Sequence, residues 1–260
     1  MRRNDRTTRR NFLRGVGVAA GSLLLGGCDD LSGAPWFRRA LSQAERLTLG
    51  VQRALLGADS LAREYTEADL SSAFRANGST NPDDPAYQAA AAENFEGWRL
   101  KVDGLVEAPG EYSLAELRTM PARTQITRHD CVEGWSCIAK WTGTTLGGVL
   151  DQAKLKPTAR FIVFHCYDTM GGGLAGAVPY YESCDLIDAY HPQTILAYGL
   201  NNEVLPVRNG APVRVRIERA LGYKQPKYVH TIEAVESFAS FGQGMGGYWE
   251  DNGYDWYGGI

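Results

Sequence analysis

A series of short β-strand patterns, separated irregularly by short helices, constrains the fold of this chain more than any other feature of its sequence. Trp98, Leu100 and Val102 alternate with charged residues, residues 160–166 form an apolar run, and apolar and charged residues alternate strictly over residues 213–217. Runs of this kind and length are typical of β-strands. Because helices and strands do not alternate regularly, we expect an α+β fold, mixed and strand-rich, rather than a doubly wound sheet.

The turns and helices between these strands follow from local patterns. Asp103-Gly104 is a turn that predicts a hairpin with its return strand at Leu105-Val106. The segment Ser113–Glu116 has the capping-box pattern that opens a short helix, which Pro121 would end. The thirty glycines and eleven prolines agree with a loop-rich fold. We also expect a helix over residues 144–153, a buried strand over 160–166, a half-exposed strand over 213–217 and a strand over 228–235.

The chain divides into three parts on these patterns. Residues 1–28 are an export segment, residues 29–90 a helical arm and linker, and residues 91–260 a single domain. Apolar residues at helical spacing predict one or two surface helices in the arm. The last nineteen residues hold seven glycines and five aromatic residues. A tail this aromatic would be insoluble if it stayed loose, so we expect it to pack onto the core or over a cofactor.

The export segment has the pattern of a twin-arginine signal. A basic region ends in Arg9-Arg10-Asn11-Phe12-Leu13, and a short apolar stretch runs from Val16 to Leu25. That stretch is too short to span a bilayer as a stable helix. An ordinary amphipathic first helix is the alternative, but the block lacks the polar face of such a helix. The expected location is the periplasmic side of the inner membrane, reached by the twin-arginine route that exports folded proteins.

Leu25-Gly26-Gly27-Cys28 resembles a lipoprotein box. In this interpretation Cys28 is lipidated, becomes the mature N-terminus and gives the protein its membrane contact. Cleavage by an ordinary signal peptidase, or an incidental cysteine, is the alternative.

The charge distribution argues against a nucleic-acid partner. The first 27 residues carry six arginines against one aspartate, a net charge of +5. Because the whole chain has a net charge of −3, the remainder carries −8. Nucleic-acid binding needs a basic surface, and this remainder is acidic.

Among the five cysteines, Cys131 has the most distinctive surroundings. Arg128 and His129 precede it in the run Arg-His-Asp-Cys-Val-Glu-Gly-Trp-Ser, and we expect these neighbours to lower the pKa of its thiol. No pair of cysteines has the close spacing of a zinc site, and the four histidines do not cluster near them. From the residues alone, a reactive or metal-binding cysteine and a buried structural one are equally supported.

The sequence around Cys131 resembles the molybdopterin-binding oxidoreductases of the sulfite oxidase family. Cys-Val-Glu-Gly-Trp-Ser is followed by Trp141-Thr-Gly, a helix and an apolar strand. Further motifs occur in the expected order: Tyr180-Tyr-Glu-Ser, residues 195–201 (Ile-Leu-Ala-Tyr-Gly-Leu-Asn), Asn209-Gly-Ala-Pro-Val-Arg214 and Gly222-Tyr-Lys224 with Lys227. The similarity covers about residues 95–240 and is closest to the branch with the catalytic subunit of bacterial methionine-sulfoxide reductase.

The resemblance implies a molybdenum centre held by molybdopterin and one cysteine thiolate. Carried over to this chain, Cys131 is the metal ligand, and Asn209 and Arg214 contact the pterin and its phosphate. Gln225, Pro226 and Lys227 then form a loop at the phosphate end. The charges of Arg214 and Lys227 suit an anionic phosphate, and we expect the domain at 91–260 to be the molybdopterin-binding domain.

Three departures from the family pattern put the substrate in doubt. Where that branch has Asn-Asn-Phe-Tyr-Glu near its start, this chain has Ser72-Ala-Phe-Arg75-Ala, which places Arg75 among the cofactor contacts. A threonine that contacts the cofactor corresponds to Cys166 here. The arginine two residues before the metal cysteine becomes His129 or Asp130.

Glu133 is a candidate catalytic residue, because a residue two positions after the metal ligand can project to the same side. It would hold a proton or a bound water near the substrate. The alternative is a structural carboxylate paired with Arg128 or another cation, and the sequence supports both equally.

Three functions fit these patterns to different degrees. The first is a molybdenum oxidoreductase that performs oxygen-atom transfer or a two-electron redox step on a small molecule or sulfoxide. Because the chain has no haem-attachment Cys-x-x-Cys-His motif, its electron-transfer partner would be a separate protein, such as a membrane haem protein. The second is a metal-free binding module that retains the fold. The third, a thiol–disulfide protein using Cys131 and Cys137, ranks last because redox cysteines usually sit closer together.

Overall fold

The computed structural model describes residues 35–171 and 176–260. The chain divides into two compact units, residues 1–54 and residues 55–260. The twin-arginine signal and the lipobox at Cys28 lie outside the described residues, so both stay predictions.

The described part of the first unit is almost entirely one helix, α2 (Pro35–Leu56). It runs for 22 residues, where the sequence predicted one or two helices. In the described ranges no helix is both long enough and apolar enough to cross a membrane.

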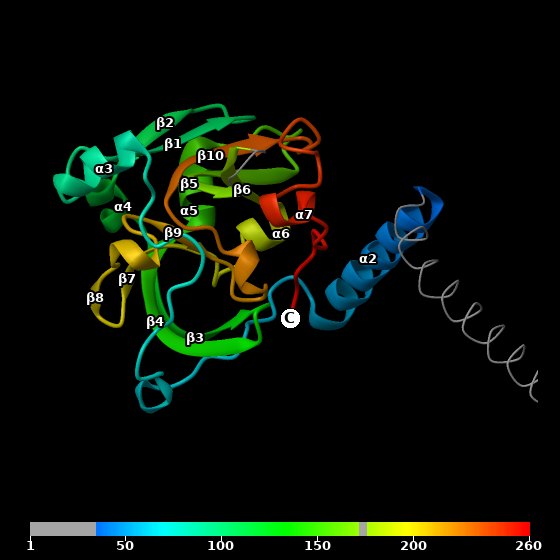
Figure 1. Ribbon diagram of the computed structural model, residues 1–260, viewed down its shortest axis with the longest axis horizontal. Helices are drawn as coiled ribbons and strands as arrows, with labels where there is room; N and C mark the ends of the chain where they lie inside the picture. Colours follow the sequence, from blue (N-terminus) through cyan, green and yellow to red (C-terminus); the bar gives the residue numbers. More distant parts are fainter. Residues whose placement is uncertain (1–34, 172–175) are drawn as a thin grey trace, which may run out of the picture. The chain divides into compact units, whose positions relative to one another are not determined.

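The second unit is built on two five-stranded sheets (Figure 1). The first has the order β2-β1-β10-β5-β6, in which β1 and β10 are parallel and all other neighbours antiparallel. The second has the order β3-β4-β7-β8, with β9 also pairing with β7, and is antiparallel throughout. The strands of the first sheet are β1 (Arg99–Gly104), β2 (Gly110–Ser113), β5 (Phe161–Gly171), β6 (Ala177–Asp185) and β10 (Val229–Val235). Those of the second are β3 (Ala122–Cys131), β4 (Trp135–Thr145), β7 (Ile195–Leu200), β8 (Glu203–Val204) and β9 (Arg214–Arg216).

Short helices connect these strands, and the mixed, strand-rich α+β fold is confirmed. The capping box predicted at Ser113 is present, with the Ser113 side chain accepting from the Glu116 amide, and it opens α4. The α-helices of this unit are α3 (Pro85–Ala92), α4 (Leu114–Thr119), α5 (Leu146–Ala153), α6 (Leu186–Ala189) and α7 (Tyr248–Asp251). Three turns of 3₁₀ helix are η1 (Glu67–Asp69), η3 (Val207–Asn209) and η4 (Gly222–Lys224).

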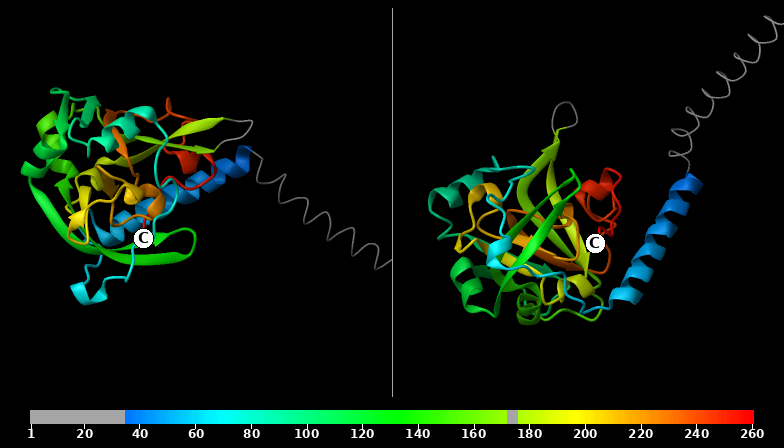
Figure 2. Two further views of the ribbon diagram at one scale, coloured as in Figure 1. Left: turned by 60° about the vertical axis from the view of Figure 1, so that its left-hand side comes forward. Right: turned by 90° about the horizontal axis from the view of Figure 1, so that it is seen from below.

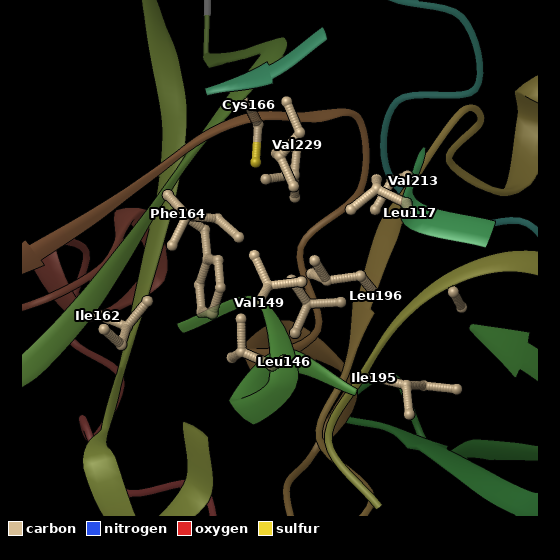
Figure 3. Packing of buried hydrophobic residues seen from close by; sticks show 14 of the residues in the cluster. Leu117, Leu146, Val149, Ile162, Phe164, Cys166, Ile195, Leu196, Val213 and Val229 are labelled. Atoms are coloured by element: carbon tan, nitrogen blue, oxygen red, sulfur yellow. The ribbon is translucent and has the colours of Figure 1, made fainter. Parts of the chain in front are cut away.

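One apolar cluster joins the two sheets. Leu146 and Val149 on α5 lie between Phe164 of the first sheet and Leu196 of the second (Figure 3). These side chains are completely buried, and each contributes roughly 1.5–3 kcal/mol relative to an exposed position. The cluster therefore packs α5 between the two sheets.

Two strand predictions differ from the structure. The return strand of the first hairpin is β2, at Gly110–Ser113, rather than Leu105-Val106, because Val106 instead forms an isolated bridge with Leu155. The strand predicted as half-exposed over residues 213–217 is buried on both faces. Its arginines are buried because Arg216 pairs with Glu218, while Arg214 bonds to backbone carbonyls.

The C-terminal segment, coloured red in Figure 2, packs beside β6. The Tyr181 hydroxyl of β6 donates to Asp251 at 2.7 Å. The Trp256 indole donates to the Ser183 hydroxyl at 2.9 Å. The expectation that this aromatic tail packs onto the core is confirmed.

Candidate functional site

An open pocket lies where the end of β3 meets η4, β9 and the C-terminal segment. Four parts of the chain that are distant in sequence supply its walls: residues 77–79, residues 131–133, the β5–β6 strands and residues 214–254. The lining residues with chemically active groups are Asn77, Cys131, Glu133, Asp168, Tyr180, Arg214, Gln225, Lys227, Trp249 and Tyr254.

Cys131 is placed at the pocket by the hairpin between β3 and β4. It is the last residue of β3, and the Gly134 amide donates to its carbonyl to close the turn. Gly134 has a φ of +85°, which favours glycine at this turn. The thiol is 9% exposed, and the Asn77 side-chain amide approaches its sulfur at 3.7 Å. Cys131 thus presents one sulfur to the pocket from a rigid strand end.

The expectation that neighbouring charges lower the pKa of Cys131 is wrong for the protein without ligands. Burial raises the pKa of this thiol, and the Glu133 carboxylate adds to the effect. Arg128 does not offset it because it pairs with Asp130 at 2.9 Å. A cation or metal centre in the pocket would be needed to hold the thiolate.

His129 is neutral and lies behind the pocket. Its Nδ1 is 2.9 Å from a guanidinium nitrogen of Arg216 and 3.3 Å from the side-chain oxygen of Gln225. Burial, reinforced by the charges of Arg216 and Arg214, lowers its pKa well below the usual value. Arg216 in turn pairs with Glu218 at 2.6 Å. The buried His129 and Arg216 therefore support the loop that carries Gln225.

Two buried cations at the pocket wall, Arg214 and Lys227, have no acidic group in contact within the described part of the chain. The guanidinium of Arg214 donates to the carbonyls of Asn209 and Gln225, at 3.1 and 3.3 Å, and the ammonium of Lys227 donates to the carbonyl of Asn77 at 2.7 Å. Burial, with the charge of Arg216, lowers the pKa of Arg214. Burial, with the charge of Arg214, lowers the pKa of Lys227 to about 7. Two buried cations this close favour an anionic ligand.

Asp168 contributes a carboxyl group with an altered pKa to the same pocket. It is 5% exposed, and its Oδ1 atom has no hydrogen-bond partner among the described residues. Burial raises its pKa to about 7, although the charge of Lys227 opposes the change. The group can therefore exchange a proton near neutral pH.

The pocket fits a molybdopterin in its donor groups. A phosphate-bearing ligand would supply a negatively charged partner for Arg214 and Lys227. Three buried polar atoms at or beside the pocket have no partner among the described residues, namely Asn209 Nδ2, Arg214 Nε and Asp168 Oδ1. Groups of three or more His, Cys, Asp or Glu side chains able to hold a metal are absent from the described ranges. A metal at Cys131 would thus take its other ligands from the cofactor.

The structure brings six of the nine residues predicted from sequence to one pocket. These are Cys131, Glu133, Arg214, Gln225, Pro226 and Lys227. Glu133 accepts a hydrogen bond from the Trp135 indole at 2.9 Å. Its expected alternative partner, Arg128, pairs with Asp130 instead.

The other three predicted residues do not line the pocket. Asn209 is buried in η3, with its carbonyl accepting from Arg214. Cys166 points into the apolar cluster beside Val229 (Figure 3), and burial raises the pKa of its thiol well above the usual value. Arg75 is exposed and lies 5.4 Å from the Trp135 ring.

Sequence reasoning missed several residues that line the pocket, among them Asn77, Asp168, Trp249 and Tyr254. Asn77 lies in the segment assigned to the helical arm and linker, and Asp168 lies two positions beyond Cys166 on β5. Trp249 and Tyr254 come from the C-terminal segment, whose aromatic content was the only signal of such a role.

The remaining cysteines give no support to a disulfide function. Cys131, Cys137, Cys166 and Cys184 are all free. In the β3–β4 hairpin Cys137 lies opposite His129, while Cys131 lies opposite Trp135.

Comparisons with known proteins agree with this geometry. The oxidoreductase molybdopterin binding domain family matches residues 87–240. A protein of Azospira oryzae, with the provisional name protein-methionine-sulfoxide reductase subunit YedZ1, is 36% identical over 254 residues. That alignment covers 96% of this chain and 87% of the relative.

Two further relatives are named as catalytic subunits of protein-methionine-sulfoxide reductase, MsrP. The proteins of Ralstonia nicotianae and Xanthomonas campestris pv. campestris are 36% and 37% identical over 163 residues, or 60% of this chain. The alignments span 49% and 50% of those relatives, about half of their length. A solved structure, the sulfane dehydrogenase SoxCD from Paracoccus pantotrophus, has 19% identity and a TM-score of 0.46, covering 55% of this chain and 39% of that one.

Proposed function

The chain belongs to the family of oxidoreductases with a molybdopterin-binding domain, and from this we propose that it is a molybdenum enzyme that reduces sulfoxides. The observation that carries the proposal is a single pocket in which the Cys131 thiol and the buried cations Arg214 and Lys227 occur together. A thiol suits a metal with soft ligands, and the cations suit a phosphate.

Each end of the pocket has residues for one part of the cofactor. Cys131 would hold the molybdenum, and Arg214, Gln225, Pro226 and Lys227 would hold the phosphate end of the molybdopterin. When bound, this group supplies two-electron redox chemistry with oxygen-atom transfer. Asn209, buried behind Arg214, orients that arginine through its carbonyl.

The protein side chains have roles in proton handling and in excluding water. Reduction of a sulfoxide to a sulfide consumes two electrons and two protons and releases water. Asp168, with its pKa near 7, can exchange one proton with the pocket at its carboxyl oxygens. Trp249 and Tyr254 provide an aromatic wall that excludes water and accepts a sulfur-bearing group.

The sulfoxide substrate is supported by the relatives rather than by the pocket alone. The three relatives described above carry the name protein-methionine-sulfoxide reductase, and each is named as a subunit. We therefore propose methionine sulfoxide in proteins as the substrate class. We propose a separate electron-transfer protein as the partner. Periplasmic location and a lipid on Cys28 complete the proposal and rest on the sequence patterns.

Metal and pterin analysis of the purified protein, followed by an activity assay, tests the function. We expect about one molybdenum and one pterin per chain, and oxidation of a reduced artificial electron donor when methionine sulfoxide is added. Sulfite with an artificial electron acceptor and N-oxides serve as comparison substrates. Absence of molybdenum in protein made by cells competent for the cofactor would support the metal-free binding module instead. A loaded enzyme that oxidises sulfite and ignores sulfoxides would refute the substrate.

A further inference from the structure

The apolar side of α2 is exposed in the described structure. Trp36, Leu47, Val51 and Leu55 keep 61%, 69%, 48% and 79% of their surface accessible. Leu47, Val51 and Leu55 are spaced by four residues and form one stripe along the helix. Trp36 falls on the same side because the interval from Trp36 to Leu47 is close to three full turns. A large apolar stripe of this kind marks an interaction surface.

The polar side of the same helix is basic. Its 22 residues contain four arginines and one glutamate, a net charge of +3. The exposed Arg46 projects to the side opposite the stripe, given the 3.6-residue period of an α-helix. The first 27 residues carry +5 and the whole chain −3, so the residues outside these two segments carry −11. The helix α2 therefore carries a net positive charge, whereas the chain outside it and the first 27 residues is strongly acidic.

We propose that α2 lies flat on an anionic phospholipid surface. The stripe from Trp36 to Leu55 enters the boundary between headgroups and acyl chains, and the basic side of the helix faces the lipid phosphates. A basic helix with one apolar face and low overall hydrophobicity has the composition of such interfacial helices. At about 1.5 Å per residue, the helix offers about 33 Å of contact along the membrane.

Charge complementarity favours a lipid surface over a second copy of this chain as the partner of α2. Arginine forms bidentate bonds with phosphate, which an anionic bilayer presents at high density. Dimerisation through this face would bring two basic helices together, and their charges would repel each other. Trp36 and Phe37, in the first turn, are residue types that are favoured at membrane interfaces. The acidic remainder of the chain would be repelled by the same surface, so α2 is the element suited to hold the protein there.

Vesicle binding by the full chain tests the proposal. The Cys28→Ser variant is used throughout, so that no lipid on that residue contributes, and all variants share the same N-terminal segment. Vesicles contain either phosphatidylglycerol with phosphatidylethanolamine or phosphatidylcholine alone. We expect stronger binding to the first kind and weaker binding at high salt. Leu47→Ser with Val51→Ser should lower the partition coefficient about tenfold or more. Thr48→Ser with Gln52→Ser, a pair of polar residues at the edge of the stripe, should change it much less.

Three results would overturn the proposal. Equal binding by the two double variants would show that the stripe does not touch lipid. Equal binding to both vesicle types, with no salt dependence, would remove the role of the arginines. A dimer in sedimentation analysis that dissociates in Leu47→Ser with Val51→Ser, without vesicle binding by the parent, would assign the stripe to a second copy. Melting temperature of each variant confirms that the domain remains folded.

Discussion

At the scale of single residues, the proposed function depends most on the sulfur of Cys131. Serine at this position offers a hard oxygen with a much higher pKa, which is a poor ligand for a metal held by sulfur. Cys131→Ser should therefore abolish reduction of methionine sulfoxide and change the electron paramagnetic resonance spectrum of the metal. The pterin content should remain measurable, because Arg214 and Lys227 are unchanged.

Cys137→Ser is the matched control, because Cys137 lies on the neighbouring strand opposite His129 and its thiol contacts the Ala73 carbonyl at 3.8 Å. It should keep both the metal spectrum and the activity. Loss of the metal in Cys137→Ser, with full activity in Cys131→Ser, would show that the wrong cysteine has been assigned.

Lys227 gives the pocket a pH dependence that anion binding can report. Its pKa is about 7 without a ligand, compared with roughly 10.4 for free lysine. Below pH 7 the ammonium is already charged, so sulfate binding to cofactor-free protein should be insensitive to pH. Above pH 7 the free protein loses the proton that the bound anion requires, and affinity should fall about tenfold per pH unit. Isothermal titration with sulfate measures this, since sulfate does not itself titrate in that range.

Two variants isolate the source of this pH dependence. Lys227→Arg should remove the lysine contribution, because arginine keeps its charge. The carboxyl group of Asp168 has a pKa near 7 and becomes negative in the same pH range. Asp168→Asn should therefore remove its contribution to the pH dependence of sulfate affinity. An unchanged pH profile in Lys227→Arg would mean that Lys227 does not bind the anion.

At the scale of elements, a buried charge cluster fastens the C-terminal segment over the pocket. Lys224 of η4 contacts Glu182 of β6 and Glu250 of α7, each at 2.5 Å. All three side chains are buried. Because Trp249 and Tyr254 flank Glu250 and line the pocket, the cluster fixes their positions.

Lys224→Met should destabilise the protein, because it leaves two carboxyl groups buried without their cation. The cost should be about 3–5 kcal/mol in the free energy of unfolding, measured with denaturant. Proteolysis should cut the C-terminal segment faster than in the parent. Lys156→Met, which alters an exposed lysine, is the control and should change neither quantity. Equal stability of the two variants would show that the cluster does not hold α7.

The elements also show which parts of the fold can be predicted from sequence. The capping box at Ser113 and the apolar run of β5 were predictable because both depend on neighbouring residues. The burial of Arg216 was not, because its partners are Glu218 and a histidine on β3, and strict alternation usually indicates an exposed face.

Only the pocket residues that belong to a recognisable sequence motif could be predicted. Cys131 and the residues from Arg214 to Lys227 were identified through the family resemblance. Asn77 was missed because it is 54 residues from Cys131 in sequence, and no local pattern reports that contact. Asp168 was missed because its unusual pKa arises from burial between strands, which sequence spacing does not show.

At the scale of the whole molecule, export and membrane attachment can be separated by two variants. Arg9→Lys with Arg10→Lys keeps the charge of the N-terminal segment but removes the paired arginines that the twin-arginine route reads. We expect that double variant to remain in the cytoplasm with its cofactor bound, since loading precedes export on this route. Cys28→Ala should instead be exported and processed differently, with no lipid at that position. Cell fractionation with immunoblotting locates each variant, and mass spectrometry of the N-terminal peptide detects the lipid.

The two variants test different steps by which the protein reaches its electron partner. Normal export of the double-lysine variant would refute the twin-arginine assignment. An unmodified Cys28 in the exported parent would refute lipidation, and α2 would then be the remaining membrane contact. If lipidation holds, Cys28→Ala should lower sulfoxide reduction in whole cells more than in the purified enzyme with an artificial donor. Attachment of enzyme and electron partner to the same membrane raises their effective concentration, and only the assay in cells depends on that encounter.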